Sequence, residues 1–259
     1  MKRSIDLNCD MGEGAGCDEQ IIPHVTSINI ACGFHAGDPA TMRKTVRLAV
    51  EHGAAIGAHP GFQDLAGFGR REMPVTPQEV YDLVLYQAGA IAAFAHAAGA
   101  FVTHLKPHGA LYNMAAKDAG IAQAIAEATH AFDPACILVG LAGSELIRAG
   151  IAAGLTTASE GFADRTYQAD GSLTPRNSPG SLISDPAAAA DQVLKMILQG
   201  TVTSLQGMDV PLRADTICIH GDSPGAANLA QTIRQRLLSE GIEIKGLTQA
   251  TSSRKQHEP

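Results

Sequence analysis

The segment FVTHLKPHG, residues 101–109, carries the pattern on which the fold prediction rests. His104, Lys106 and His108 occupy alternate positions after an apolar start. Successive side chains of a β-strand point to opposite faces, so these three are predicted to point the same way. A proline and a glycine then close the strand. The segment is therefore predicted to be a strand with one face reserved for chemistry.

Short apolar runs of this kind alternate along the chain with longer helical segments, which is the pattern of a parallel sheet. Strands are predicted at 4–10, 27–33, 54–59, 101–106, 136–141, 155–160 and 215–221, with a weaker one at 242–247. About seven βα units, too few for a regular eight, predict an α/β fold: a parallel β/α barrel with a missing or irregular strand. A doubly wound open sheet is the alternative. In both folds a ligand site belongs at the carboxyl ends of the strands.

Four helices are marked at both ends by capping residues. Their starts are predicted at Asp38, Thr76, Asp185 and Ser223, each followed by proline, and their ends at Gly53, Gly99, Gly200 and Gly241. The long connections 60–75 and 161–184 are expected to be functional, because long loops in compact domains usually are. We expect one barrel domain over residues 1–250 and a disordered tail over 251–259.

Composition excludes several classes of protein. The 259 residues are 45% hydrophobic and 17% charged, and the formal charge of −7 argues against a nucleic-acid partner. Five widely spaced cysteines suit reduced thiols better than a disulfide framework. The first residues lack the apolar run of a signal peptide, and the most apolar stretch, 88–103, is too short to span a bilayer. We therefore expect a cytoplasmic protein, without membrane association, whose partners are small molecules or proteins.

The alternation seen at 101–109 recurs at other strand ends. Polar residues of one parity are Asp6, Asn8 and Asp10 in the first strand, Asn29 and His35 in and after the second, His59 in the third, Glu160 in the sixth, and His220 and Asp222 in the last. A barrel predicts this pattern, because one face of each strand packs on helices while the other lines the interior. These side chains are expected to converge on one site.

The sequence GDSPG at 221–225 matches the nucleophile elbow G-x-S-x-G, which lies between a strand and a helix. The oxyanion hole of that motif uses the backbone N–H after the serine, and Pro224 has none. Ser223 is therefore predicted to be a helix N-cap and not a nucleophile.

A metal site and a nucleotide site give weaker signals. His35, His59, His108 and His220, with Asp6, Asp10 or Asp222, are suitable ligands for a divalent ion, so a catalytic metal stays open. Cys32 has zinc-like spacing to His35 but lies on the opposite parity. No phosphate-binding loop of the G-x-x-x-x-G-K type is present, and the glycine-rich GEGAGC at 12–17 does not follow a known nucleotide motif.

Long motifs in order give the chain a family resemblance. They are DLNCDMGEG (6–14), NIACGFHAGDP (29–39), IGAHPGFQDLAGFGRR (56–71), YQAGA (86–90), HLKPHGALYN (104–113), EGFADRTY (160–167) and ICIHGD (217–222). With these the sequence resembles the LamB/YcsF family, the family of the A subunit of bacterial ATP-dependent 5-oxoprolinase. The resemblance implies a seven-stranded β/α barrel like those of the glycoside hydrolase/deacetylase superfamily. It also implies cleavage of the lactam of 5-oxo-L-proline to L-glutamate, with hydrolysis of ATP (with Mg²⁺) to ADP and phosphate, together with B and C subunits.

This chemistry suggests roles for the candidate residues. An unreactive lactam would first be phosphorylated on its carbonyl oxygen, which requires positioned cations; water attack and protonation of the ring nitrogen require a general base and acid. The catalytic candidates are His59, Lys106, His108, Asp222, Asp6 and Glu160. The substrate-binding candidates are His35, Arg70, Arg165, His220 and Asn8.

Two rival classes remain open. One is a metal-dependent amidohydrolase or deacetylase that works without ATP, and the other is a non-catalytic lactam-binding or regulatory subunit. The sequence leaves open which subunit binds ATP and what the oligomeric state is.

Overall fold

The computed structural model describes residues 3–221 and 225–247. Seven parallel strands form a closed barrel in the order β1-β2-β3-β4-β5-β6-β9, and β9 pairs back with β1. The strands are β1 (Ser4–Met11), β2 (Ser27–Ala31), β3 (Ala55–His59), β4 (Val102–Leu105), β5 (Ile137–Leu141), β6 (Thr157–Phe162) and β9 (Thr216–Ile219). The predicted barrel is confirmed, and the alternative of an open sheet is wrong because the sheet has no break between β9 and β1.

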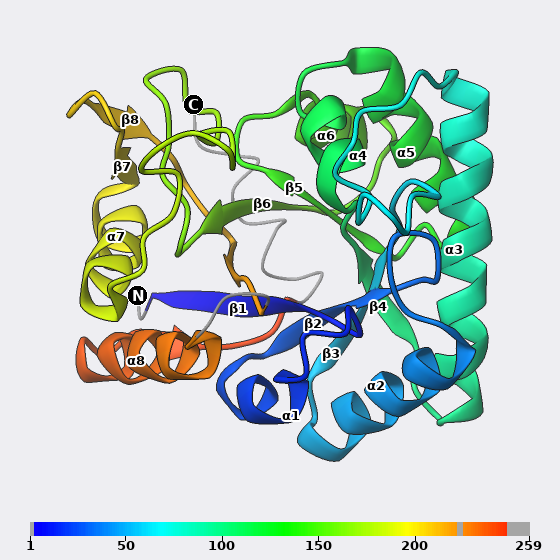
Figure 1. The fold of residues 1–259 in the computed structure, drawn as a ribbon, viewed down its shortest axis with the longest axis horizontal. Coiled ribbons are helices and arrows are strands. Elements are labelled where there is room, and N and C mark those ends of the chain that lie inside the picture. The colour runs from blue at the N-terminus through cyan, green and yellow to red at the C-terminus, as the bar shows by residue number, and fades with distance from the viewer. Residues whose placement is uncertain (1–2, 222–224, 248–259) are drawn as a thin grey trace.

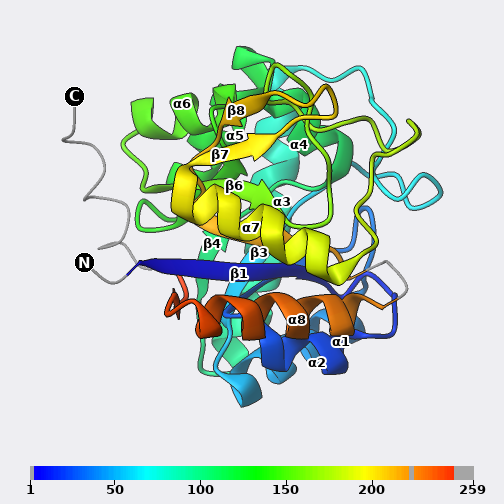
Figure 2. The same cartoon turned by 90° about the vertical axis from the view of Figure 1, so that its left-hand side faces the viewer.

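Helices surround the barrel and cover its outer face (Figures 1 and 2). They are α1 (Asp18–Ile21) with the 3₁₀ turn η1 (Ile22–His24), α2 (Pro39–His52), α3 (Pro77–Ala97), α4 (Gly109–Ala115), α5 (Ala119–Phe132), α6 (Glu145–Ala152), α7 (Pro186–Gln199) and α8 (Ala226–Ser239). Apolar residues of the outward strand faces, such as Leu7 and Ile28, are fully buried against them. The inward faces are therefore left to the polar residues.

Local signals placed most helix ends correctly. Asp38 caps α2, Thr76 forms a capping box with Glu79 on α3, and Asp185 caps α7. Gly53 and Gly200 end their helices with φ of 66° and 68°, a left-handed conformation that glycine adopts without strain. The start of α8 differs from the prediction, because its N-cap is Gly225. The predicted cap Ser223 lies outside the described residues, as does the tail 251–259.

Some strand ends and one additional sheet depart from the predicted strands. The second strand ends at Ala31 and the strand predicted at 215–221 ends at Ile219, each two residues earlier than expected. The sixth strand begins two residues later than expected, at Thr157. A short antiparallel pair, β7 (Thr201–Thr203) and β8 (Asp209–Pro211), was not predicted and lies outside the barrel. The weak last strand is confirmed as β10 (Glu243–Ile244), which pairs with the start of β1. The assignment of residues 1–250 to a single domain stays a prediction.

No helix in the described ranges has the length and apolar character needed to cross a membrane.

Candidate active site

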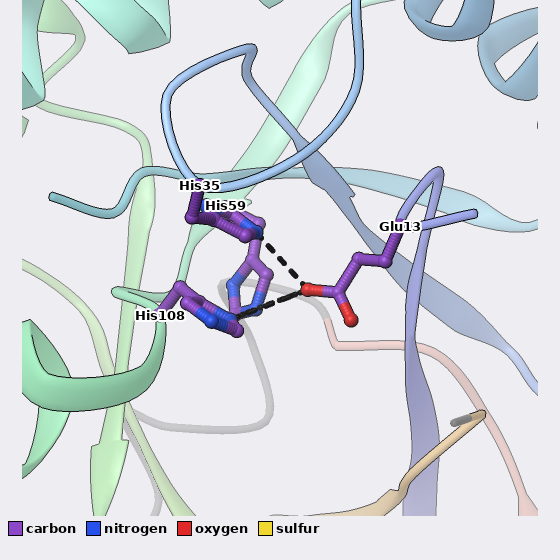
Figure 3. A group of neighbouring side chains, drawn as sticks. All are labelled: Glu13, His35, His59 and His108. Atoms are coloured by element: carbon purple, nitrogen blue, oxygen red, sulfur yellow. Dashed lines mark hydrogen bonds and ion pairs between the residues drawn. The ribbon is translucent and has the colours of Figure 1, made fainter. Parts of the chain in front are cut away.

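Three histidines and one glutamate meet at the carboxyl end of the barrel. Oε1 of Glu13 lies 3.0 Å from Nε2 of His35, 3.2 Å from Nδ1 of His108 and 3.7 Å from Nε2 of His59. Nδ1 of His108 is also 3.1 Å from Nε2 of His59. Figure 3 shows the three imidazole rings and the carboxylate turned toward one another. We call these four residues the histidine cluster.

Neighbouring strands deliver the histidine cluster. Glu13, His35 and His108 follow β1, β2 and β4, and His59 is the last residue of β3. Because these four strands are adjacent and parallel, their carboxyl ends meet at one place. The histidines were predicted, but Glu13 was missed. It lies beyond the strand, in a loop where the two-residue alternation no longer applies; its position just after a strand end was the available signal.

The histidine rings contact the backbone on the side away from Glu13. His59 and His108 form hydrogen bonds to carbonyl oxygens, and His35 packs against Gly61. Nδ1 of His59 bonds the carbonyl oxygen of Lys106 at 2.7 Å, and Nε2 of His108 bonds that of Phe68 at 2.8 Å. Phe68 has φ of 55°, a conformation that costs energy for a bulky residue and persists only where surroundings enforce it. The 60–75 loop thus lies over the histidine cluster. At Gly61 a Cβ atom would come within 2.6 Å of Nδ1 of His35, so only glycine fits there without a shift.

Lys106 is enclosed below the histidine cluster. Its Nζ lies 2.9 Å from Oδ1 of Asp10, 2.9 Å from Oε1 of Glu160 and 3.1 Å from Sγ of Cys218. Burial by itself would lower the pKa of Lys106, but Asp10 and its other neighbours outweigh burial and raise that pKa well above its usual range. The ammonium is thus charged and already paired with protein carboxylates.

Two carboxylate–histidine pairs adjoin this centre. Oδ2 of Asp10 lies 3.4 Å from Nε2 of His59, and Oδ1 of Asp164 lies 2.8 Å from Nδ1 of His220. The His220 ring stacks on Phe162, and His220 offers a ligand atom within 4.8 Å of Asp10. Asp164 was missed because it follows β6 in the long loop after that strand, again beyond the reach of strand alternation.

Burial and neighbouring charges shift the pKa values of the residues in the site. Burial would raise the pKa of Asp10, but His59 and Lys106 hold it well below its usual range. Burial lowers the pKa of His35 to about 4, and it also lowers that of His108. For His59, burial acts downward but Asp10 and Glu13 outweigh it, so its pKa is raised. These shifts favour an ionised Asp10 and a protonated His59.

Deeper in the barrel the polar residues bond one another. Asn8 donates to Glu160 at 3.0 Å and to Thr216 at 2.7 Å, and the hydroxyl of Tyr112 donates to Glu160 at 2.7 Å. Asp6, near the start of β1, accepts hydrogen bonds from the hydroxyls of Thr26, Ser27 and Thr216. Burial raises the pKa of Asp6 to about 6. Asp6 thus lies at the opposite end of β1 from the histidine cluster.

Three remaining candidates do not belong to the histidine cluster. The guanidinium of Arg165 is buried and donates to the carbonyl oxygens of Thr174 and Ser181, so it holds the 161–184 loop together. Arg70 is exposed and lies over the ring of Phe68, 4.9 Å from its centroid. Asp222 lies outside the described residues. Of the strand-end residues expected to converge on one site, the structure brings together His35, His59, Lys106, His108, Glu160 and His220, whereas Asp6 lies at the other end of β1.

Comparison with known proteins identifies the family to which the sequence is similar. The sequence profile of the LamB/YcsF family matches residues 5–252. The chain is 62% identical, over 94% of its length and 96% of the relative's, to a Geobacillus kaustophilus protein named as the A subunit of 5-oxoprolinase. It is 56% identical to the Bacillus subtilis protein of the same name, over 96% and 99% of the two chains.

Solved structures agree with this placement. The crystal structure of a lactam utilization protein from Thermus thermophilus is 48% identical and superposes with a TM-score of 0.88, covering 94% of this chain and all of that one. A peptidoglycan deacetylase from Bacillus subtilis, at 12% identity and a TM-score of 0.51 over 98% and 93% of the two chains, shares the fold alone. The chain therefore belongs to the LamB/YcsF family.

Proposed function

We propose that this chain is the lactam-processing subunit of an ATP-dependent 5-oxoprolinase. The assembled enzyme would convert 5-oxo-L-proline, ATP and two waters to L-glutamate, ADP and phosphate, with B and C subunits as partners. The observation that carries the proposal is the end-to-end similarity to relatives named as the A subunit of 5-oxoprolinase. The barrel interior supports it by bringing together several groups capable of proton transfer.

The two carboxylate–histidine pairs suit the hydrolytic half of such a reaction. A carboxylate that accepts a hydrogen bond from one ring nitrogen fixes the tautomer, which leaves the other nitrogen as base or acid. In the Asp164–His220 pair the bonded nitrogen is Nδ1, so Nε2 is available for the proton of a water or of the lactam nitrogen. In His59 the bond of Nδ1 to the carbonyl oxygen of Lys106 fixes the tautomer instead, so Nε2, beside Asp10, is the nitrogen that would handle the second proton.

ATP would supply the phosphoryl group that activates the lactam carbonyl. The described residues near the site fit a triphosphate poorly, because Lys106 is enclosed by carboxylates and Arg165 is bonded to backbone oxygens. We therefore place the phosphates of MgATP at a subunit junction or on a partner. Arg70, exposed on the 60–75 loop that covers the histidine cluster, is retained as a candidate ligand of the substrate carboxylate.

A metal-dependent amidohydrolase that needs no ATP is the second candidate. The observation that favours it is the histidine cluster, whose four ligand-type atoms lie within 4.8 Å of one another. It would act on the same kind of cyclic amide, so the two candidates differ in their requirement for ATP.

Glutamate release from 5-oxoproline separates these functions. We expect release only when the chain, the B and C subunits and MgATP are all present. In that assembly His220→Asn should lower the rate by about 10²–10⁴-fold, the usual contribution of a general acid or base. The matched control is His130→Asn on the exposed face of α5, which should leave the rate unchanged.

The other outcomes identify the rivals. Release by the chain alone without ATP would make it a self-sufficient amidohydrolase, and ATP-dependent release by the chain alone would disprove the division of labour. Full turnover by both His220→Asn and His59→Gln would leave only a binding or regulatory role.

A further inference from the structure

We propose that Glu13, His35, His59 and His108 form a binding site for one first-row transition metal ion, of the Zn²⁺ type. The inference deepens the proposed function, and it rests on that function only for the use of the ion in lactam hydrolysis. Whether the site binds metal follows from the geometry of the chain itself.

The separations within the histidine cluster match a coordination polyhedron. Ligands at the 2.0–2.1 Å typical of zinc–nitrogen and zinc–oxygen bonds lie about 3.3 Å apart in a tetrahedron. Four of the six separations among the ligand atoms of the histidine cluster are 3.0, 3.1, 3.2 and 3.7 Å. All four residues offer ligand atoms within 4.8 Å of one another. An ion at the centre would therefore find its ligand atoms already close to their required spacing.

The tautomers aim nitrogen lone pairs at this centre. His59 donates from Nδ1 to a backbone carbonyl, and His108 donates from Nε2 to another. In the neutral rings the inward nitrogens, Nε2 of His59 and Nδ1 of His108, then carry lone pairs. A backbone oxygen behind each ring is the usual second partner of a metal-bound histidine. The strained backbone at Phe68 serves this arrangement, because its carbonyl is the one that holds His108.

Charge at the centre also calls for a cation. The ammonium of Lys106 is paired with Asp10 and Glu160, whereas Glu13 faces the three histidines. Two lone-pair nitrogens 3.1 Å apart, facing a buried carboxylate, repel one another unless a proton or a metal ion lies between them. His35 and His108 are at most 5% exposed, and burial disfavours protonated rings.

The donor set selects the class of metal. Three imidazole nitrogens and one carboxylate oxygen suit zinc and its first-row neighbours, whereas Mg²⁺ prefers oxygen ligands and keeps several waters. The site is thus distinct from the magnesium that accompanies ATP. A second group of ligand-type residues, Asp10, Cys218 and His220, is not included, because Nζ of Lys106 lies 2.9 Å from Asp10 and 3.1 Å from Cys218 and fills that position.

Metal binding by the purified full chain tests the proposal without any lactam assay. The chain is stripped with a chelator, dialysed against Zn²⁺ and analysed by mass spectrometry for bound metal. We expect one ion per chain, and His59→Gln or His108→Gln should weaken binding by at least about 100-fold, the upper end of what even an outer-sphere partner costs. The matched control is His104→Gln, since His104 is buried in the same barrel but bonds Asn29 and Thr103.

A spectrum of the unmutated chain covers the case in which the variants fail to fold. Co²⁺ in a tetrahedral site absorbs strongly in the visible range, whereas Co²⁺ held by six waters or oxygens absorbs weakly. Strong absorption that disappears on addition of Zn²⁺ would support the proposal.

The proposal is overturned by any of three results: no stoichiometric Zn²⁺ or Co²⁺, only weak absorption, or equal metal loss in His104→Gln and the cluster variants. Because glutamate release is measured separately, a chain that binds no metal would leave the proposed 5-oxoprolinase function standing.

Discussion

The two ends of the barrel interior are both buried and polar, but they are built differently. Around Asp6, three hydroxyl groups donate to one carboxylate, and each partner is satisfied within the group. In the histidine cluster, the backbone bonds lie behind the rings of His59 and His108, and the inward atoms are acceptors that converge. The comparison indicates that a closed hydrogen-bond network maintains the fold, whereas convergent lone pairs mark a place for a ligand or a reaction.

The largest expected effect comes from a substitution in the histidine cluster. In the assembled complex His59→Gln should lower glutamate release by about 10²–10⁴-fold, because it removes both a cluster nitrogen and the partner of Asp10. His104→Gln should cost stability but far less activity. The rates of glutamate release and the melting temperatures of both variants test this. Equal losses of rate would show that the histidine cluster has no special role in catalysis.

Removal of the ammonium of Lys106, which lies between the histidine cluster and the Asp6 network, should mainly destabilise the fold. Lys106→Met leaves Asp10 and Glu160 buried without their shared ammonium, which should cost about 3–5 kcal/mol in the free energy of unfolding. The double variant Lys106→Met/Asp10→Asn should recover part of this loss. Urea denaturation at pH 7 measures both, and a loss below about 1 kcal/mol would show that the buried ion pairs are not structural.

The network around Asp6 should make the stability of the fold depend on pH. The pKa of Asp6 is about 6 in the fold and 3.8 without it, so the folded state binds the proton more tightly. The stability that this provides is present below pH 3.8 and is lost as the pH rises through 6. The stability of the unmutated chain relative to Asp6→Asn should therefore fall by about 2 kcal/mol between pH 4 and pH 7. Urea denaturation at the two pH values checks this, and a constant difference would contradict it.

The smallest expected effect comes from the removal of one of the three hydroxyl donors to Asp6. Ser27→Ala removes one of three hydroxyl donors to Asp6 and should cost about 1 kcal/mol, because the hydroxyls of Thr26 and Thr216 still satisfy the carboxylate. Glutamate release should be unchanged. A loss of activity comparable to that of His59→Gln would mean that the two regions act as one unit.

The sequence by itself determined the elements and the inward faces of the strands. Alternation with period two is a local property of extended backbone, so the parity of Asn8, His59, Lys106 and Glu160 predicted correctly that they point into the barrel. Helix caps such as Asp38 and Thr76 are equally local, because they depend on hydrogen bonds within a few residues.

Only the tertiary structure decided how the inward residues pair. Closure of β9 onto β1 joins segments about two hundred residues apart along the chain. Lys106, a catalytic candidate from the sequence, lies between two protein carboxylates from β1 and β6, a pairing that the sequence did not predict. Glu13 and Asp164 join the site from loops, where no period relates sequence position to direction. Their placement depends on which strand ends become neighbours, and that is known only once the barrel has closed.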